Sequence, residues 1–192
     1  MTDPGLAPPP SPGDSRHPQA SRRTWLVASM AGVAALAGVG LSWLTRAPEV
    51  ATDAGLSAFW TRSFDVPGHA PLAMSGFAGH PLLLNFWATW CAPCIEELPL
   101  LDRFYAENSA KNWQVLGLAV DETSSVQAFL RHAPVRFPIA MAGMAGIQLS
   151  KTLGNLGGGL PFTIVIGSGG QVLHRKMGRV QPADLLLWST LR

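Results

Sequence analysis

The stretch Asn85–Cys94 reads Asn-Phe-Trp-Ala-Thr-Trp-Cys-Ala-Pro-Cys, and it decides the fold of the chain. It overlaps Leu82–Ala88, an uninterrupted apolar run typical of a central parallel strand covered on both faces. A helix is predicted from Cys91 to Asn108, because apolar side chains recur there at helical spacing (Cys94, Leu98, Leu101 and Tyr105). The two cysteines therefore stand where a buried strand passes into a helix.

Strands and helices alternate through the rest of the chain. The apolar pattern predicts a strand over Trp113–Val120 and a hairpin of Phe162–Ile166 with Gln171–Lys176, joined by a glycine-rich loop. The predicted helices are Ser124–His132, Ile147–Leu153 and Ala183–Leu191. The first of these begins with a capping-box pattern, Ser-x-x-Gln. This order of elements predicts an α/β fold with a mixed sheet.

Composition and charge exclude several classes of protein. Charged residues make up 14% of the 192 residues and the net charge is +2, so no basic surface suited to nucleic acid is expected. Hydrophobic residues make up 47%, which excludes a mainly disordered chain. The chain has only two cysteines, so a scaffold stapled by several disulfides and a Cys₄ zinc site are excluded as well.

Three segments precede the globular part of the chain. Residues 1–23 hold six prolines and no aromatic residue, which indicates a disordered tail. Trp25–Leu44 carries no charge and, as a helix, would span the roughly 30 Å of a bilayer core. Residues 24–45 are therefore expected to be a transmembrane signal anchor, residues 46–58 a linker, and residues 59–192 the working domain.

Arginines are concentrated before the apolar segment. Arg16, Arg22 and Arg23 precede it, and Arg46 alone follows closely, so the positive-inside rule places the N-terminus in the cytoplasm and the domain across the membrane. An alternative is a cleavable export signal, because Ser21–Leu26 resembles a twin-arginine motif. Both alternatives place the domain on the same side of the membrane.

The spacing of Cys91 and Cys94 points to redox chemistry. Two intervening residues at a helix start bring the sulfurs within disulfide range. Cys91 lies at the helix N-terminus, where unpaired backbone N–H groups and the helix dipole favour a thiolate. Cys94 lies one turn further in, on the apolar face. We therefore expect Cys91 to attack an incoming disulfide and Cys94 to resolve the mixed disulfide.

Two plainer interpretations of the cysteine pair are a static disulfide and half of a zinc site. A bridge that closes so short a loop removes little entropy from the unfolded chain. The five histidines show no ligand spacing that would complete a zinc site. No metal ion is expected at the pair.

Asn85–Cys94, followed by Glu97-Leu98-Pro99, resembles the active site of the thioredoxin superfamily. More narrowly, the chain resembles the membrane-anchored TlpA/ResA-like thiol-disulfide reductases of the bacterial periplasm. The resemblance covers residues 59–192. It implies a thioredoxin-like fold, a central mixed sheet flanked by helices, with the TlpA-type insertion over residues 134–155. It also implies a single-pass protein of the inner membrane with its domain in the periplasm.

The resemblance implies contacts with substrate around the two cysteines. Pro161 is expected to be the cis-proline that faces them, with Leu160 beside it, and Trp90 is expected to cap the site. These three residues would touch the substrate. The chain departs from the family at Phe162, where a threonine is often found.

A second departure concerns proton transfer. Asn85 stands where thioredoxin carries a buried aspartate, and an amide cannot take the proton of Cys94. Glu97 follows Cys94 by three residues and so shares its helix face. The resemblance implies that a glutamate here takes part in proton transfer, and partial burial would raise its pKa. The alternative is a solvated carboxylate that complements the helix dipole, as expected for Glu96.

Partners and direction follow from the same resemblance. The substrates would be exported proteins with disulfides, with the haem-attachment cysteines of apocytochrome c or the copper-site cysteines of an oxidase as candidates. A thiol-transducing membrane protein would be the reductant. Ala92-Pro93 places no histidine between the cysteines to stabilise the thiolate, which favours reduction of a partner. The alternatives are a DsbA-type oxidant or isomerase and a copper chaperone. No cofactor is expected.

Overall fold

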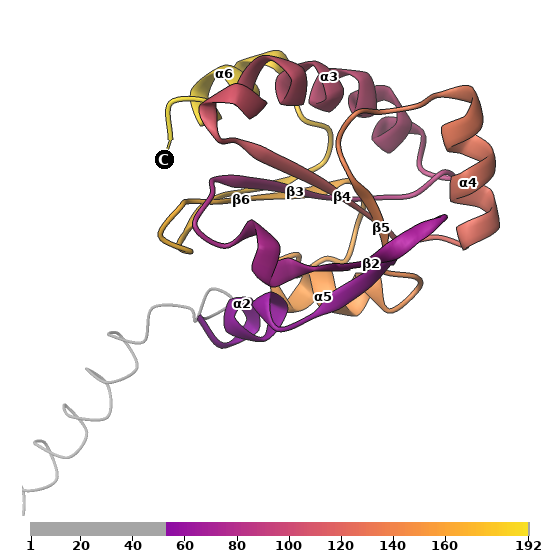
Figure 1. The fold of residues 1–192 in the computed structure, drawn as a ribbon, viewed down its shortest axis with the longest axis horizontal. Coiled ribbons are helices and arrows are strands. Elements are labelled where there is room, and N and C mark those ends of the chain that lie inside the picture. The colour runs from indigo at the N-terminus through magenta and orange to yellow at the C-terminus, as the bar shows by residue number, and fades with distance from the viewer. Residues whose placement is uncertain (1–52, 192) are drawn as a thin grey trace, which may run out of the picture. The chain divides into compact units, whose positions relative to one another are not determined.

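A sheet of seven strands in the order β2-β1-β5-β4-β3-β6-β7 forms the middle layer of the domain (Figure 1). The structure is a computed structural model that describes residues 53–191. Its strands are β1 Ser63–Val66, β2 His69–Ala73, β3 Leu82–Trp87, β4 Gln114–Ala119, β5 Ile139–Met141, β6 Phe162–Ile166 and β7 Val172–Met177. Its α-helices are α2 Asp53–Trp60, α3 Ala92–Asn108, α4 Thr123–His132, α5 Gly146–Thr152 and α6 Pro182–Trp188, and two 3₁₀ turns are Met74–Phe77 and Ser109–Lys111.

Strand β3 lies inside the sheet between two well-paired neighbours. It runs parallel to β4, with Asn85 opposite Gly117, and antiparallel to β6, with Asn85 opposite Thr163. All six residues of β3 are buried, as the apolar run predicts. The chain leaves the C-terminal end of β3 and enters α3, so the junction that carries the cysteines is anchored on the best-paired strand of the sheet.

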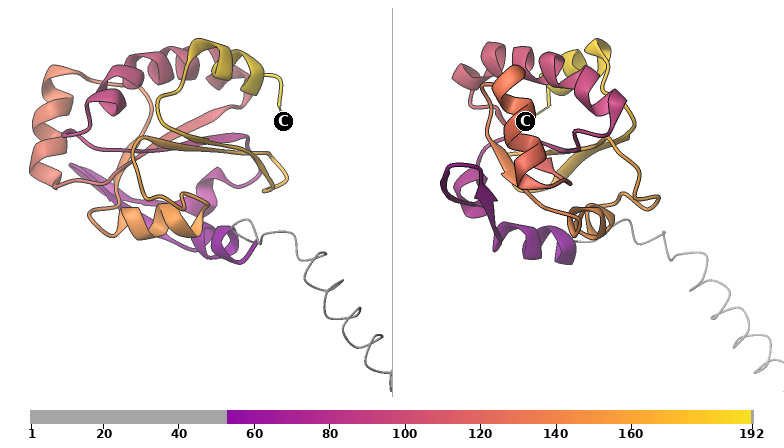
Figure 2. Two further views of the ribbon diagram at one scale, coloured as in Figure 1. Left: turned by 180° about the vertical axis from the view of Figure 1, so that it is seen from behind. Right: turned by 90° about the vertical axis from the view of Figure 1, so that its right-hand side faces the viewer.

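Helices cover both faces of the sheet (Figure 1; Figure 2). Alternate side chains of each strand enter different cores, as the pleat requires. Leu83, Trp87 and Val165 pack toward α3 and α6, whereas Leu84 and Phe86 pack toward α2 and α5. Asn85 belongs to the first set by its position in the strand, so its polar side chain is directed to the face that α3 covers.

The predicted linker over residues 46–58 is wrong in its second half. Helix α2 begins at Asp53, and its Leu56 is 7% exposed and its Phe59 fully buried in the core beneath the sheet. Small polar residues alternate with apolar ones here, and packing of the apolar face stabilises a short helix that composition alone does not indicate. The domain therefore begins before residue 59.

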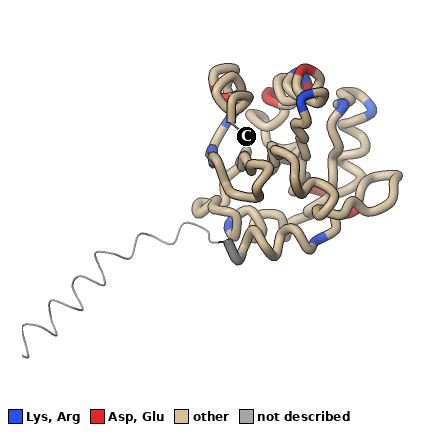
Figure 3. The backbone as a smooth tube through the Cα atoms, turned by 60° about the vertical axis from the view of Figure 1, so that its left-hand side comes forward, with Lys and Arg blue, Asp and Glu red and all other residues tan. Residues whose placement is uncertain are grey.

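The predicted tail and transmembrane anchor lie outside the described residues, as do Trp25 and Leu44. Within residues 53–191, no helix is long and apolar enough to cross a bilayer. Charged positions in the same part of the chain are scattered over helices, strands and loops (Figure 3).

Most predicted elements of the domain are confirmed, with shifted ends. The hairpin of β6 and β7 and the helices α3, α4 and α5 lie where the pattern places them, and α6 ends at Trp188 rather than Leu191. The strand β5 and the helix α5 fall within residues 134–155, the expected insertion. The capping box at Ser124 is wrong, because α4 begins at Thr123 after Glu122 and has no side-chain cap. The hairpin of β1 and β2 was not expected.

Candidate active site

Cys91 and Cys94 form a disulfide at the N-terminus of α3, with their Cα atoms 5.3 Å apart. Cys91 is the N-cap residue in an extended conformation, and its carbonyl accepts the backbone N–H groups of Cys94 and Ile95 at 3.0 and 3.2 Å. Cys91 is 6% exposed, whereas Cys94 is fully buried. The two sulfurs are therefore unequal, and an approaching partner meets Cys91 first.

The helix start gives Cys91 the environment of a reactive thiol. The first N–H groups of a helix lack intrahelical acceptors, and the dipole places partial positive charge at this end. A negative charge on the Cys91 sulfur is stabilised there once the disulfide is reduced. Cys94 lies three residues further along α3 and is fully buried, so it lacks access to solvent.

An aspartate at the end of β4 fixes the turn that leads into Cys91. One carboxylate oxygen of Asp121 accepts the backbone N–H of Thr89 at 2.7 Å and its hydroxyl at 2.6 Å. The other oxygen accepts the N–H of Glu122 at 2.7 Å. Thr89 lies two residues before Cys91, so Asp121 joins the reactive turn to the neighbouring strand. Sequence reasoning missed Asp121, although its position after a buried strand is a signal that could have found it.

Glu97, one turn after Cys94 in α3, is fully buried and holds three segments together. Its Oε1 accepts Nδ2 of Asn85 at 2.7 Å, and its Oε2 accepts the backbone N–H of Val180 at 2.6 Å. The same Nδ2 also donates to Oγ1 of Thr163 at 3.0 Å. The cluster joins β3, α3, β6 and the segment after β7. Thr163 and Val180 are members that sequence reasoning missed, because 78 and 83 residues separate them from their partners.

Burial raises the pKa of Glu97 from 4.5 to about 7. The N–H of Val180, the amide of Asn85 and the charges of Arg179 and Lys176 oppose this rise, because each favours the carboxylate. Desolvation is the larger effect. A carboxyl group that gains and loses its proton near neutral pH is suited to acid–base work, as the sequence predicts for this residue.

Glu96 lies on the outer side of the same helix turn, as expected. It is exposed and forms an ion pair with Arg179, which is also largely exposed. An exposed pair of this kind contributes little to stability. The neighbouring glutamates therefore differ in environment: Glu97 points into the domain and Glu96 points into solvent.

The structure brings the expected substrate-contacting residues to the end of the sheet that carries the disulfide. Phe162, the first residue of β6, lies opposite Phe86 near the end of β3, so Leu160 and Pro161 enter the sheet close to where β3 leaves it. The Leu160–Pro161 peptide bond is cis, as the sequence predicts. Trp90 is 62% exposed. Trp87, the last residue of β3, is fully buried.

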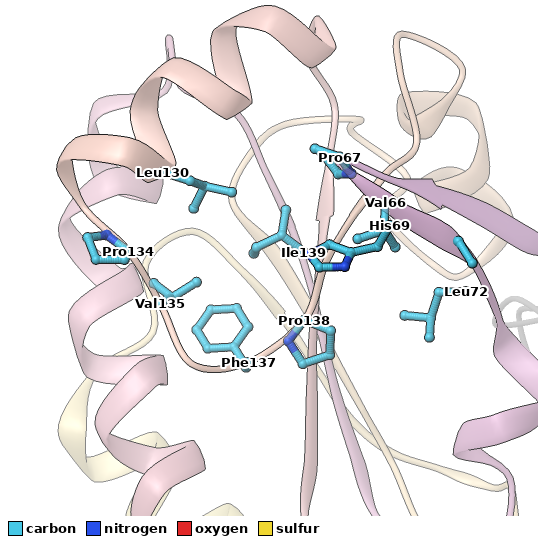
Figure 4. A pocket seen from close by; sticks show the side chains of 11 residues that line it. Val66, Pro67, His69, Leu72, Leu130, Pro134, Val135, Phe137, Pro138 and Ile139 are labelled. Carbon is cyan, nitrogen blue, oxygen red and sulfur yellow. The ribbon is translucent and has the colours of Figure 1, made fainter.

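A cavity of about 410 Å³ lies away from the disulfide, between the hairpin of β1 and β2 and the segment that joins α4 to β5 (Figure 4). Its lining is mostly apolar, and neither cysteine belongs to it. Within residues 53–191, no group of three or more His, Cys, Asp or Glu side chains could hold a metal ion. The chemistry of the described residues is therefore concentrated at the disulfide and Glu97.

A mixed sheet between helices, with a Cys-x-x-Cys disulfide at the start of the helix that follows the central strand, defines a thioredoxin-like protein. A thiol:disulfide interchange protein of the thioredoxin family from Chlorobium tepidum has the same fold, with a TM-score of 0.60 and 24% identity over 67% of this chain and 90% of that one. The chain belongs to the AhpC/TSA family, whose model matches residues 61–175.

Two further kinds of similar protein show more specifically what the chain resembles. Thiol-disulfide oxidoreductase ResA of Bacillus thuringiensis is 32% identical over 108 residues, which is 56% of this chain and 60% of the relative. ResA of Geobacillus kaustophilus is 29% identical over 63% of this chain and 67% of the relative. A thioredoxin-related protein of Neisseria meningitidis serogroup B is 28% identical with a TM-score of 0.59, over 67% of this chain and 96% of that one. The chain thus spans about 60% of the first of these curated relatives.

Proposed function

We propose that the chain is a thiol-disulfide oxidoreductase that reduces disulfides in exported proteins. The observation that carries the proposal is the asymmetry of the pair: Cys91, the N-cap residue of α3, is 6% exposed, and Cys94 is fully buried. A purely structural bridge has no need of a buried carboxyl group with a pKa near 7 beside it. The name of the ResA relatives, thiol-disulfide oxidoreductase, agrees with this chemistry.

The reaction transfers two electrons from the reduced pair to the partner. The Cys91 thiolate attacks one sulfur of the partner's disulfide, forming a mixed disulfide and releasing the other partner sulfur as a thiolate. Cys94 loses its proton and attacks the Cys91 sulfur, which releases the second partner thiol. The products are a dithiol partner and the Cys91–Cys94 disulfide seen in the structure. A dithiol donor reverses the change by the same exchange.

Glu97 is the group that takes the proton from Cys94 in this scheme. Glu97 and Cys94 lie one turn apart in α3 and both are fully buried. Burial suppresses the ionisation of a thiol as it does that of a carboxyl group. A base with a pKa near 7 can receive the proton directly or through a water molecule, and Asn85 holds that base in place.

The partners belong to the same proposal. Apocytochrome c, with its haem-attachment cysteines, or the copper-site cysteines of an oxidase would be the substrate. A thiol-transducing membrane protein would be the reductant. Ala92 and Pro93 supply no positive charge between the cysteines, so the reduced form receives no extra stabilisation there, and electrons flow toward the partner.

A periplasmic location is proposed from the sequence before the domain. A reporter enzyme that works only outside the cytoplasm, alkaline phosphatase, is expected to be active when fused after Leu44, because the arginines that precede Trp25 stay inside. A cytoplasmic reporter fused at the same point is expected to be inactive. The reverse pattern contradicts the proposed topology, and a mature N-terminus near Thr45 would replace the anchor by a cleaved signal.

The proposed activity can be tested in a single turnover. The pre-reduced protein, freed of reductant, is mixed with a synthetic peptide in which a Cys-x-x-Cys-His sequence is closed by a disulfide. We expect one peptide disulfide to be reduced for each protein molecule, with none reduced by Cys91→Ser. If the wild-type protein keeps its two electrons while the peptide stays oxidised, the reductase proposal fails.

A further inference from the structure

The loop Gly157–Gly159 has no side chains of its own, yet it delivers Leu160 and Pro161 to the disulfide end of the sheet. We propose that Asn155 is the positioning residue of this loop: its side chain ties the loop to helix α5 and thereby holds Leu160 and Pro161 where a substrate peptide lies. The inference rests on the proposed function and adds a residue that neither the sequence pattern nor the family resemblance assigns.

Asn155 is fully buried, and its side-chain amide donates hydrogen bonds both to helix α5 and to the loop. Its Nδ2 donates to the hydroxyl oxygen of Ser150 at 3.0 Å, and to the carbonyl of Gly159 at 2.8 Å. The hydroxyl of Ser150 donates in turn to the carbonyl of Ile147 at 2.8 Å, inside α5. A continuous chain of hydrogen bonds therefore runs from α5 through Asn155 to the residue that precedes Leu160.

The backbone of Asn155 reinforces this attachment. Its N–H donates to the carbonyl of Ser150 at 2.9 Å, and its carbonyl accepts the N–H of Gly158 at 3.0 Å. Gly158 has a φ of +66°, in the left-handed region that glycine adopts without strain. The loop is therefore a tight turn around the buried side-chain amide of Asn155.

A run of three glycines needs such an attachment. Glycine loses more conformational entropy on ordering than any other residue, and Gly157 and Gly159 are exposed, so packing contributes little to their order. Without the amide of Asn155, the carbonyl of Gly159 is released and the loop samples many conformations. Helix α5 acquires a role from this contact: it is the support from which the loop is held.

The pairing of strands in the sheet places the loop near the two cysteines. Strands β3 and β6 are antiparallel, with Phe86 opposite Phe162, so the segment before β6 lies near the segment after β3. The N–H of Gly178 donates to the carbonyl of Pro161 at 2.9 Å, which fixes the far side of the loop. Pro161 is thus held on one side by Gly178, the residue after β7, and the loop before it is held by Asn155 on the other.

The test compares two disulfide reagents on the Asn155→Ala variant. A peptide closed by one disulfide must lie along the loop, whereas 5,5′-dithiobis(2-nitrobenzoate), a small aromatic disulfide, needs access to Cys91 alone. We expect the second-order rate constant of the reduced variant with the peptide to fall about 10- to 100-fold, because an ångström of misplacement has effects of this size. The rate constant with the small disulfide is expected to stay at the wild-type value.

Asn108→Ala is the matched control. Asn108 is also a buried asparagine that donates from Nδ2 to a carbonyl, that of Phe104, but it lies at the other end of α3. The Asn108→Ala variant should have a lower melting temperature than the wild type, as Asn155→Ala should, and an unchanged rate constant with the peptide. A second change, Gly157→Ala, should restore part of the peptide rate, because that position has open space and a φ outside the left-handed region.

Three results would overturn the inference: an unchanged peptide rate in Asn155→Ala, an equal loss with both reagents, or an equal loss in Asn108→Ala. Amide hydrogen exchange separates this inference from the proposed function. Exchange over residues 157–160 should speed up in Asn155→Ala even if the wild-type protein reduces no peptide. Unchanged exchange there contradicts the positioning role whatever the activity.

Discussion

Hydrogen-bond donors surround the carboxyl group of Glu97 and define what its proton can do. Nδ2 of Asn85 and the N–H of Val180 each donate to one oxygen, which favours the carboxylate. The acid form must place its proton against one of these donors, but burial disfavours the charge more strongly and brings the pKa to about 7. The residue therefore changes its protonation state in the range where the protein would work.

Replacing Glu97 by glutamine is expected to slow turnover while leaving the attack by Cys91 intact. Removal of one positioned acid–base group costs about 10²- to 10⁴-fold in rate. The form that accepts a proton from Cys94 is the carboxylate, so the wild-type rate should rise as the pH rises through about 7. This rise should be absent in Glu97→Gln. The measurement is the pH profile of peptide reduction for both proteins.

Glu96→Gln is the matched control for this prediction, because the adjacent side chain is exposed and faces about 100° away.

The pH dependence of stability gives a second test of Glu97. Between pH 4.5 and about 7 the folded protein holds a proton on Glu97 that the unfolded chain has lost, so stability falls as the pH rises, by on the order of 3 kcal/mol. Glu97→Gln should remove this slope. If Glu97→Gln keeps the wild-type rate and pH profile of peptide reduction, Glu97 has only a structural role.

At this scale the sequence predicts only part of the site. The spacing of Cys94 and Glu97 along one helix is a local property, so their shared face could be foreseen. The partners of Glu97 are not local: Val180 is 83 residues away and comes within reach only because the chain after β7 returns over α3. The role of Asp121 could not be predicted for the same reason: Asp121 contacts Thr89 only because β4 pairs with β3.

Among the elements, the helix that carries the chemistry begins without a side-chain cap, as α4 and α5 also do. Cys91 caps α3 without a side-chain hydrogen bond, so no capping side chain competes with a thiolate for the partial positive charge at this helix end. Helix α6 shows the contrasting arrangement. Gln181 and Asp184 form a capping box there, with Pro182 in the first turn. A cap that satisfied the N–H groups of α3 in this way would compete with the sulfur.

Helix starts also show where pattern and packing disagree. The Ser-x-x-Gln pattern at Ser124 predicts a capping box, but α4 begins one residue earlier, at Thr123, and its N-cap residue Glu122 makes no side-chain hydrogen bond. Helix α2 was expected as linker, because its composition is small and polar, yet Phe59 anchors it in the core. For α2, a tertiary contact thus decides the start of an element that neighbouring residues leave open.

Across the whole domain, the sheet assembles the site from distant segments. The end of β3 supplies the cysteine turn, the start of β6 supplies Pro161, and the segment after β7 supplies the N–H that binds Glu97. Alternating strands and helices predict an α/β fold, and the buried run of β3 predicts its central strand. The hairpin of β1 and β2 escaped prediction, because its short strands are largely exposed and carry little apolar signal.

The account depends most on the unequal roles of Cys91 and Cys94, and trapping a mixed disulfide tests those roles directly. Reduced Cys94→Ser is mixed with the disulfide peptide, and the adduct is located by mass spectrometry of the digested protein. The account predicts a stable covalent adduct on Cys91, because the resolving sulfur is missing, and no adduct in Cys91→Ser, whose remaining thiol is buried. An adduct that forms readily on Cys94 in Cys91→Ser, or none on Cys91 in Cys94→Ser, would contradict it.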